Sequence, residues 1–244
     1  MITLVIAEAA LETVPAAMID HPSVKKYAQR TGRASSEILL DRSYHHYAML
    51  HSNLEARWKR GRPDIVHFAL MEALSTPLFF EGSLNVYVHT VNDKLISIGD
   101  NLRIPKSYFR FEALMIDLFK KKVISSVNAA HDDNNNNNIR SNKILLEIHE
   151  GITFEKVIKE IIKPAKLIGL STVGVQRTAQ AVVTKSISVQ NADCTFVVGG
   201  FPKGHFSSNT MALLSSLYSI SEYSLEAHVV IARILYECEN YIHK

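Results

Sequence analysis

The chain has 244 residues, of which 47% are hydrophobic and 21% are charged. This length and composition are typical of a folded globular protein and exclude a mainly disordered one. The formal net charge is only +3, but the segment from Lys25 to Arg62 holds nine Lys and Arg residues against three acids, a local charge of +6. Such a segment is either a solvated helix face or the contact surface for a polyanion such as nucleic acid.

Metal and membrane partners are not expected. The two cysteines, Cys194 and Cys238, form no C-x-x-C pair, which disfavours a cysteine-based zinc site and fits a reducing compartment. The neighbouring His45 and His46 would point apart on a helix, so they do not form a metal site. The first residues lack the basic region of a secretory signal, and no run approaches the ~20 apolar residues of a membrane span. We therefore expect a cytoplasmic protein.

The first half of the chain shows a strand followed by helices and a hairpin. The predicted strands are Ile2–Ile6, Leu84–Thr90 and Lys94–Ile98, the last two joined by a turn at Val91–Asp93. The predicted helices are Ala7–Met18, His45–Lys59, Pro63–Leu74 and Pro105–Lys122. Proline at the first turn of a helix is tolerated, which supports the starts at Pro63 and Pro105.

The second half begins with a low-complexity surface loop, residues 128–142, which contains the run HDDNNNNN and has no apolar side to bury. The elements predicted after it are strand Ile144–Ile148, helix Thr153–Ile162, strands Leu167–Ser171 and Cys194–Val198, and helix Leu225–Tyr241. Strands that alternate with helices predict an α/β fold with a mostly parallel sheet. We expect one domain, 1–244, with an insertion around residues 20–62.

Two loops are candidates for ligand binding. The buried strand at Cys194–Val198 runs into FVVGGFPKGHF, where Gly199 and Gly200 allow either a tight turn or a close approach to a ligand. This loop matches neither G-x-G-x-x-G nor a P-loop, so a dinucleotide or triphosphate cradle is not supported. In LYSISEYSL, Ser221 or Ser224 is either a helix N-cap or part of a loop that holds an adenine through its backbone.

Two basic motifs are candidates for RNA contacts. In RGRPD, Arg62 and Asp64 flank a proline, and an arginine held by a carboxylate is oriented for a phosphate or a base edge, or is a structural ion pair. In RIPKSYFR, the cations Arg103 and Arg110 and the hydroxyl of Ser107 lie at or before a helix N-terminus, an arrangement that suits phosphate or is ordinary solvated charge.

Several segments together resemble one known family. They are LVIAEAALETVP, LLDRSYHHYAML, RGRPDIVHFALMEAL, PLFFEGSLNVYVHT, RIPKSYFRFEALMIDLF, LIGLST, FVVGGFPKGHF and ISEYSL, in order from end to end. This set resembles the ribosome-biogenesis pseudouridine-N1 methyltransferases (essential for mitotic growth, or nucleolar essential protein) of the SPOUT trefoil-knot superfamily. The chain lacks the long N-terminal extension of eukaryotic members, so it looks more like an archaeal one.

The resemblance implies an α/β knot, a homodimer, and methyl transfer from S-adenosylmethionine to N1 of a pseudouridine in small-subunit rRNA, with ribosome assembly factors as further partners. The cofactor positions that it implies are Leu170, Gly199, Gly204, Ile220, Ser221, Glu222, Tyr223, Ser224 and Leu225. The rRNA positions that it implies are Arg62, Arg103, Ser107 and Arg110. Asp64 would steady Arg62, and it is the one acid of this site available as a general base.

The sequence departs from the family pattern at two places. Glu222-Tyr223-Ser224 stands where the family commonly has Asn or Asp followed by Tyr-Pro, and Ser107 stands where Asn or Thr is frequent. Two other functions are to be compared with the enzyme. One is a non-catalytic RNA-binding assembly factor. The other is a Rossmann-type oxidoreductase, which is disfavoured because Ile6-Ala7-Glu8-Ala9 offers no glycine after the first strand.

Overall fold

Side chains alternate between two cores along the first strand, β1 (Ile2–Ala9). Ile2, Leu4 and Ile6 face one hydrophobic cluster, whereas Val5 and Ala7 face another. Successive side chains of a strand point to opposite faces, so both faces of this strand must be covered by other elements. That burial on two faces is characteristic of the central strands of a parallel α/β sheet.

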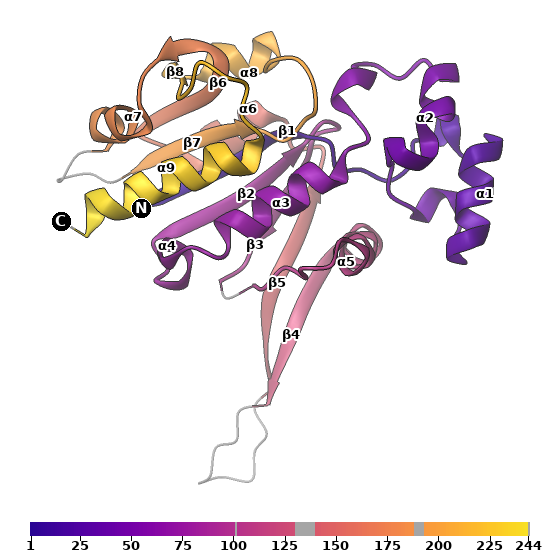
Figure 1. Cartoon of the computed structure of the whole chain (residues 1–244). Helices are drawn as coiled ribbons and strands as arrows, with labels where there is room; N and C mark the ends of the chain where they lie inside the picture. Colours follow the sequence, from indigo (N-terminus) through magenta and orange to yellow (C-terminus); the bar gives the residue numbers. More distant parts are fainter. Residues whose placement is uncertain (101, 130–139, 188–192, 244) are drawn as a thin grey trace, which may run out of the picture.

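The computed structural model of the chain describes residues 1–100, 102–129, 140–187 and 193–243. Within these ranges the strands form one mixed sheet in the order β4-β5-β3-β2-β1-β7-β6-β8 (Figure 1). The strands after β1 are β2 (Leu84–Thr90), β3 (Lys94–Ile98), β4 (Val123–Ala129), β5 (Arg140–Glu150), β6 (Lys166–Gln176), β7 (Cys194–Gly199) and β8 (Ser216–Ser219).

The neighbouring strands β2, β1, β7, β6 and β8 pair in parallel, whereas β2, β3, β5 and β4 pair antiparallel. The expected α/β class with a mostly parallel sheet is therefore confirmed. The strand order does not test the knot, which stays a prediction.

The helical elements cover both faces of the sheet and form a lobe at one end (Figure 1). They are η1 (Ala16–Met18), α1 (Pro22–Thr31), η2 (Ser35–Glu37), α2 (Arg42–His51), η3 (Arg57–Lys59), α3 (Pro63–Ala73), α4 (Pro77–Phe80), α5 (Tyr108–Lys121), α6 (Phe154–Lys156), η4 (Val157–Ile162), α7 (Ala179–Ser186), α8 (Ser208–Leu213) and α9 (Ala227–Ile242).

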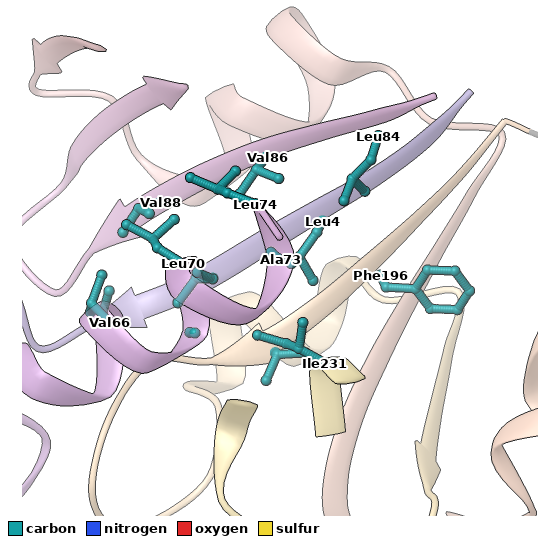
Figure 2. Close-up of a cluster of buried hydrophobic side chains, with 14 of the residues drawn as sticks. Leu4, Val66, Leu70, Ala73, Leu74, Leu84, Val86, Val88, Phe196 and Ile231 are labelled. Atoms are coloured by element: carbon teal, nitrogen blue, oxygen red, sulfur yellow. The ribbon is translucent and has the colours of Figure 1, made fainter. Parts of the chain in front are cut away.

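Helices α3 and α9 lie side by side over one face of the sheet (Figure 1). Val66 and Leu70 of α3 and Ile231 of α9 pack against Leu4 and Val88 of the central strands (Figure 2). The opposite face is covered by α6, η4 and the segment before α8. Burial of each large apolar side chain stabilises this packing by roughly 1.5–3 kcal/mol.

The lobe at the right of Figure 1, formed by α1, α2 and the turns around them, has a small core of its own. Val24 and Tyr27 of α1 pack there against Ala48 and Met49 of α2. The lobe corresponds to the basic segment 20–62. The chain enters the lobe after the end of β1 and leaves it at the start of α3, so the lobe projects beyond the ends of the strands (Figure 1).

Several predicted boundaries were wrong. No helix spans Ala7–Met18: β1 continues to Ala9, which pairs with Thr90, and the chain is then extended up to η1. Strand pairing here overrides the helical propensity of the Ala-, Leu- and Glu-rich segment. The helix expected at His45–Lys59 begins at Arg42 and ends at His51, and η3 follows separately.

The helix expected from Pro105 begins at Tyr108, with Ser107 as its N-cap. The expected loop 128–142 is strand at both ends, in β4 and β5, and its residues 130–139 lie outside the described residues. The predictions at Pro63–Leu74, Leu84–Thr90, Lys94–Ile98 and Cys194–Val198 are confirmed to within one residue. Helices α1, α4, α7 and α8 and strands β4 and β8 were not predicted.

Candidate functional site

A pocket of about 380 Å³ lies where the pairing of β6 with β7 ends. Parallel strands end at a common edge, and ligands of open α/β sheets bind outside that edge. Eight of the nine predicted cofactor positions line this pocket: Leu170, Gly199, Gly204, Ile220, Ser221, Tyr223, Ser224 and Leu225. Glu222 is not among its lining residues. Segments far apart in the sequence therefore form one cavity, as the resemblance requires.

The glycine loop comes directly after β7, and its backbone passes close to β1. A Cβ on Gly200 would lie 2.7 Å from Cγ2 of Ile6 and 2.9 Å from Cα of Ala9, so a side chain does not fit there. Gly204 has φ +89°, a conformation that residues with a side chain rarely adopt. Gly199 and Gly200 can therefore serve both predicted roles. They allow a tight turn, and that turn brings the loop to the pocket.

The lining of the pocket fits a nucleoside-type cofactor such as S-adenosylmethionine. Leu170, Val198 and Leu225 supply apolar walls. In the part of the chain that the structure describes, the backbone N–H and C=O groups of Ser224 and Leu225 make no hydrogen bond. Backbone groups that line a pocket without a partner are suited to hydrogen-bond the polar edge of a bound base.

The serines of this segment do not cap α9. The N-cap of that helix is Glu226, which makes no side-chain capping hydrogen bond. Ser221 Oγ instead accepts a hydrogen bond from the amide of Tyr223 at 3.0 Å, and the Ser221 carbonyl accepts one from Ser219 Oγ at 2.8 Å. Both bonds are local and hold the loop in a turn without a proline. The N-cap interpretation of Ser221 and Ser224 is therefore wrong.

Arg62 reaches the same pocket from the start of α3. Its Nε donates to Asp64 Oδ1 at 2.8 Å and its Nη2 donates to Oδ2 at 2.7 Å, a two-point ion pair. These hydrogen bonds raise the pKa of Arg62, although partial burial opposes them. The side chain stays 41% exposed, so its remaining N–H groups are free to meet a phosphate or a base. Pro63 separates the partners and starts α3, which fixes their spacing.

The other predicted RNA positions do not line this pocket. Arg103, Ser107 and Arg110 are exposed along the segment that leads into α5. Arg103 borders a separate depression beside Leu74. Ser107 is the N-cap of α5, but its hydroxyl makes no hydrogen bond with any of the residues that the structure describes. The segment is attached to α3 because the His67 ring donates to the Pro105 carbonyl at 2.7 Å.

A buried ion pair supports the glycine loop, and it was missed in the sequence. Glu8 accepts hydrogen bonds from Lys59 and from the Ser207 amide, the latter at 2.7 Å. Lys59 Nζ also lies 4.5 Å from the ring centre of Phe201, which lines the pocket. Burial raises the pKa of Glu8, but its hydrogen bonds with Lys59, Ser207 and Thr210 outweigh burial and hold that pKa below its ordinary value. An acid within the apolar strand VIAEA was the available signal.

Much of the charge in the basic segment is neutralised locally. Four of its nine cations pair with carboxylates: Lys25 with Asp20, Lys59 with Glu8, Arg60 with Glu12, and Arg62 with Asp64. The other five are Lys26, Arg30, Arg33, Arg42 and Arg57, for which the described residues show no ion pair within 4 Å. The cations of the lobe without a carboxylate partner thus lie on α1 and just after it, at the start of α2 and in η3.

Cys194 and Cys238 are both buried, unpaired thiols. Burial raises the pKa of Cys194 to about 12, so it has no thiolate character near neutral pH. Among the described residues, no group of three or more His, Cys, Asp and Glu side chains is arranged to hold a metal ion. Within the same ranges no helix has the length and apolar character required to cross a membrane.

The comparisons with known proteins match the chain and its fold to a family of methyltransferases. The family model described as EMG1/NEP1 methyltransferase matches residues 4–239. The chain is 36% identical to the "Ribosomal RNA small subunit methyltransferase Nep1" of Thermococcus onnurineus over 99% of this chain and 100% of that protein. It is 36% identical to the protein of the same name from Pyrococcus furiosus, over 88% of this chain and 87% of the relative.

A solved structure agrees with these matches. The crystal structure of Archaeoglobus fulgidus Nep1 bound to S-adenosylhomocysteine aligns with a TM-score of 0.78 and 30% identity, over 99% of this chain and 98% of that one. The chain therefore belongs to the EMG1/NEP1 methyltransferase family, which confirms the resemblance found in its motifs. The oxidoreductase alternative is excluded by this assignment.

Proposed function

We propose that the protein transfers a methyl group from S-adenosylmethionine to N1 of a pseudouridine in small-subunit ribosomal RNA during ribosome biogenesis. The observation that carries the proposal is that Arg62, held by Asp64, lies in the same pocket as the glycine loop. Relatives are named as small-subunit rRNA methyltransferases, and one related structure contains S-adenosylhomocysteine, the form of the cofactor that has lost its methyl group.

In this proposal the pocket residues position the two reactants. When bound, S-adenosylmethionine supplies an electrophilic methyl group on a sulfonium. The backbone of Ser224 and Leu225 would hold its base, and Gly199 and Gly204 would let the main chain approach it. Arg62 would hold the flipped pseudouridine or its phosphate so that N1 is in line with the methyl carbon and sulfur. Alignment of this kind lowers a barrier by several kcal/mol.

Asp64 would orient Arg62 rather than remove the N1 proton. Both carboxylate oxygens already accept a hydrogen bond from the guanidinium, so the carboxylate is engaged in holding Arg62. The N1 proton would then leave to water. If Asp64→Asn lost most of its activity at neutral pH and the acidic ionisation of the wild-type pH–rate profile disappeared, the carboxylate would have to be the base.

Arg103, Ser107 and Arg110 would contact the RNA outside the methylation pocket, along the exposed start of α5. The cations of segment 20–62 would bind the phosphate backbone and make affinity fall as salt rises. Pseudouridine lies in RNA loops, where bases can be splayed out and recognised at their edges. The substrate expected from this arrangement is a hairpin loop and not a continuous duplex.

The active form would be a cytoplasmic homodimer that works beside ribosome assembly factors. Phe68 of α3 and Tyr236 of α9 are 53% and 62% exposed on neighbouring helices, which is unusual for large aromatic side chains without a partner. Sedimentation at micromolar concentration would give twice the chain mass. A monomer with full activity would remove the dimer from the proposal.

The decisive experiment measures transfer of labelled methyl from S-adenosylmethionine to two rRNA hairpins that differ only in uridine or pseudouridine at the loop target. Transfer to the pseudouridine hairpin alone is expected. Transfer to both hairpins would show that the enzyme does not require pseudouridine at the target position. Transfer to neither, with tight hairpin binding intact, would favour the assembly-factor function and make the departures at Glu222 and Ser224 the first suspects.

A further inference from the structure

A second pocket, of about 410 Å³, lies between the lobe and α5, and its lining residues are distinct from those of the methylation site. Its lining includes Tyr27 and Arg30 of α1, Tyr44 of α2, and Phe109 and Glu112 of α5. Cavities that hold small ligands are of this size, and they combine apolar or aromatic walls with a few polar groups. This cavity has both.

Stacked rings and a cation form one wall. Tyr27 and Tyr44 have ring centres 4.2 Å apart and planes 24° apart. The guanidinium of Arg30 lies 4.8 Å from the centre of the Tyr27 ring and 4.9 Å from that of Tyr44. Phe109 contributes a ring that is 75% exposed, although it lies one residue into a helix with a buried face. Exposed aromatic faces beside arginine are the platforms on which unpaired bases stack.

A carboxylate lies among these rings. Glu112 is only 8% exposed, and its Oε1 accepts a hydrogen bond from the Tyr27 hydroxyl at 3.1 Å. Its Oε2 makes no hydrogen bond within the described residues. Burial raises the pKa of Glu112 above its ordinary value, and the hydrogen bond from Tyr27 and the guanidinium groups of Arg33 and Arg30 offset only part of that rise. An available carboxylate oxygen of this kind accepts a hydrogen bond from an exocyclic amino group.

The position of the pocket links it to the proposed RNA path. Phe109 immediately precedes Arg110 and lies in the first turn of the helix capped by Ser107. The neighbouring Tyr108 donates its hydroxyl to Asp41 at 3.1 Å, which joins α5 to the start of α2. The pocket residue Phe109 and the predicted RNA contact Arg110 thus lie side by side in the exposed first turn of α5.

We propose that this pocket binds one unpaired nucleotide of the RNA substrate, with its base stacked beside Phe109 and Tyr44 and its exocyclic amino group bonded to Glu112. The occupant is a base with an exocyclic amino group, such as cytosine, and not uracil, whose O4 would face the carboxylate as a second acceptor. Arg33, which also lines the pocket, meets its phosphate. This inference rests on the proposed RNA substrate and adds a specificity site to it.

The test uses fluorescence anisotropy with labelled hexamers of cytidine and of uridine. Wild-type protein should bind the cytidine hexamer about tenfold more tightly, the discrimination expected of one base-edge contact. Phe109→Ala should weaken cytidine binding about tenfold, and Phe109→Tyr should restore it. Glu112→Gln should reduce the preference for cytidine, because an amide can donate to uracil O4 as well as accept.

The matched control is Tyr47→Ala. Tyr47 is an exposed aromatic residue of the same lobe, 66% exposed, that does not line the pocket, so cytidine binding should not change. Equal binding of the two hexamers by wild type, or unchanged cytidine binding in Phe109→Ala, would overturn the proposal. Wild-type methyl transfer to the pseudouridine hairpin separates the two ideas: transfer without the hexamer pattern refutes only this pocket, and the hexamer pattern without transfer refutes only the reaction.

Discussion

Replacement of Lys59 by methionine should show how far the buried ion pair with Glu8 supports the glycine loop. The exposed fractions are 7% for Lys59 and 8% for Glu8, so the substitution leaves a buried carboxylate without its countercharge. Loss of one partner of a buried pair costs about 3–5 kcal/mol in the free energy of unfolding. The Ser207 amide still donates to Glu8 at 2.7 Å, so we expect the lower end of that range, about 3 kcal/mol.

The same substitution should weaken cofactor binding, because Lys59 lies over Phe201 in the pocket wall. The lost cation–π contact corresponds to about 1 kcal/mol, which is about a fivefold increase in the Kd for S-adenosylhomocysteine. Urea denaturation would give the free energy of unfolding, and calorimetric titration would give the Kd. Glu8→Gln together with Lys59→Met should recover most of the stability, because a neutral amide still accepts from the Ser207 amide.

The pH dependence of the unfolding free energy gives a further check on the contribution of the Glu8–Lys59 pair. In wild type the pKa of Glu8 is below its ordinary value of 4.5, so the stability that it contributes is present above pH 4.5 and is lost as the pH falls through its folded pKa. In Lys59→Met, burial without the countercharge raises that pKa, so acid relieves the penalty. The difference in stability between the two proteins should therefore shrink at acid pH. A difference below about 1 kcal/mol at pH 7, or a double variant no more stable than the single one, would refute the reasoning.

Three further outcomes are expected. Gly200→Ala should destabilise the fold by about 1–3 kcal/mol in urea denaturation and abolish S-adenosylhomocysteine binding, because its Cβ would meet Cα of Ala9 at 2.9 Å; normal binding would contradict this. Burial lowers the pKa of His45 from 6.5 to about 4, and its Nδ1 accepts a hydrogen bond from the Asp41 amide. Because the unfolded chain takes up this proton first as the pH falls, the unfolding free energy should decrease by roughly 3 kcal/mol between pH 6.5 and 4. His45→Asn should lack this dependence on pH. Arg62→Lys should reduce methyl transfer to the hairpin at least about tenfold and leave the Kd for S-adenosylhomocysteine within about twofold; an equal loss of both would assign Arg62 to the cofactor.

The candidate site could be predicted where its residues are close in sequence. Arg62 and Asp64 flank a proline at a helix start, so local geometry alone brings their charged groups together. The glycine loop could be placed because a buried strand directly precedes it. The predicted cofactor residues came from a motif match, and eight of the nine line one pocket. Glu222 is exposed and does not line it.

Composition and short-range pattern thus determined the α/β class, the central strands, the longest helices and the motifs of the family. Only the tertiary structure decided that Ala7–Ala9 is strand, because its partners Thr90 and Gly199 come from distant segments. It also decided the pairing of Glu8 with Lys59 and the closure of the aromatic pocket between the lobe and α5. The physical reason is that these contacts join residues tens of positions apart, and their stability depends on burial that exists only after the chain has folded.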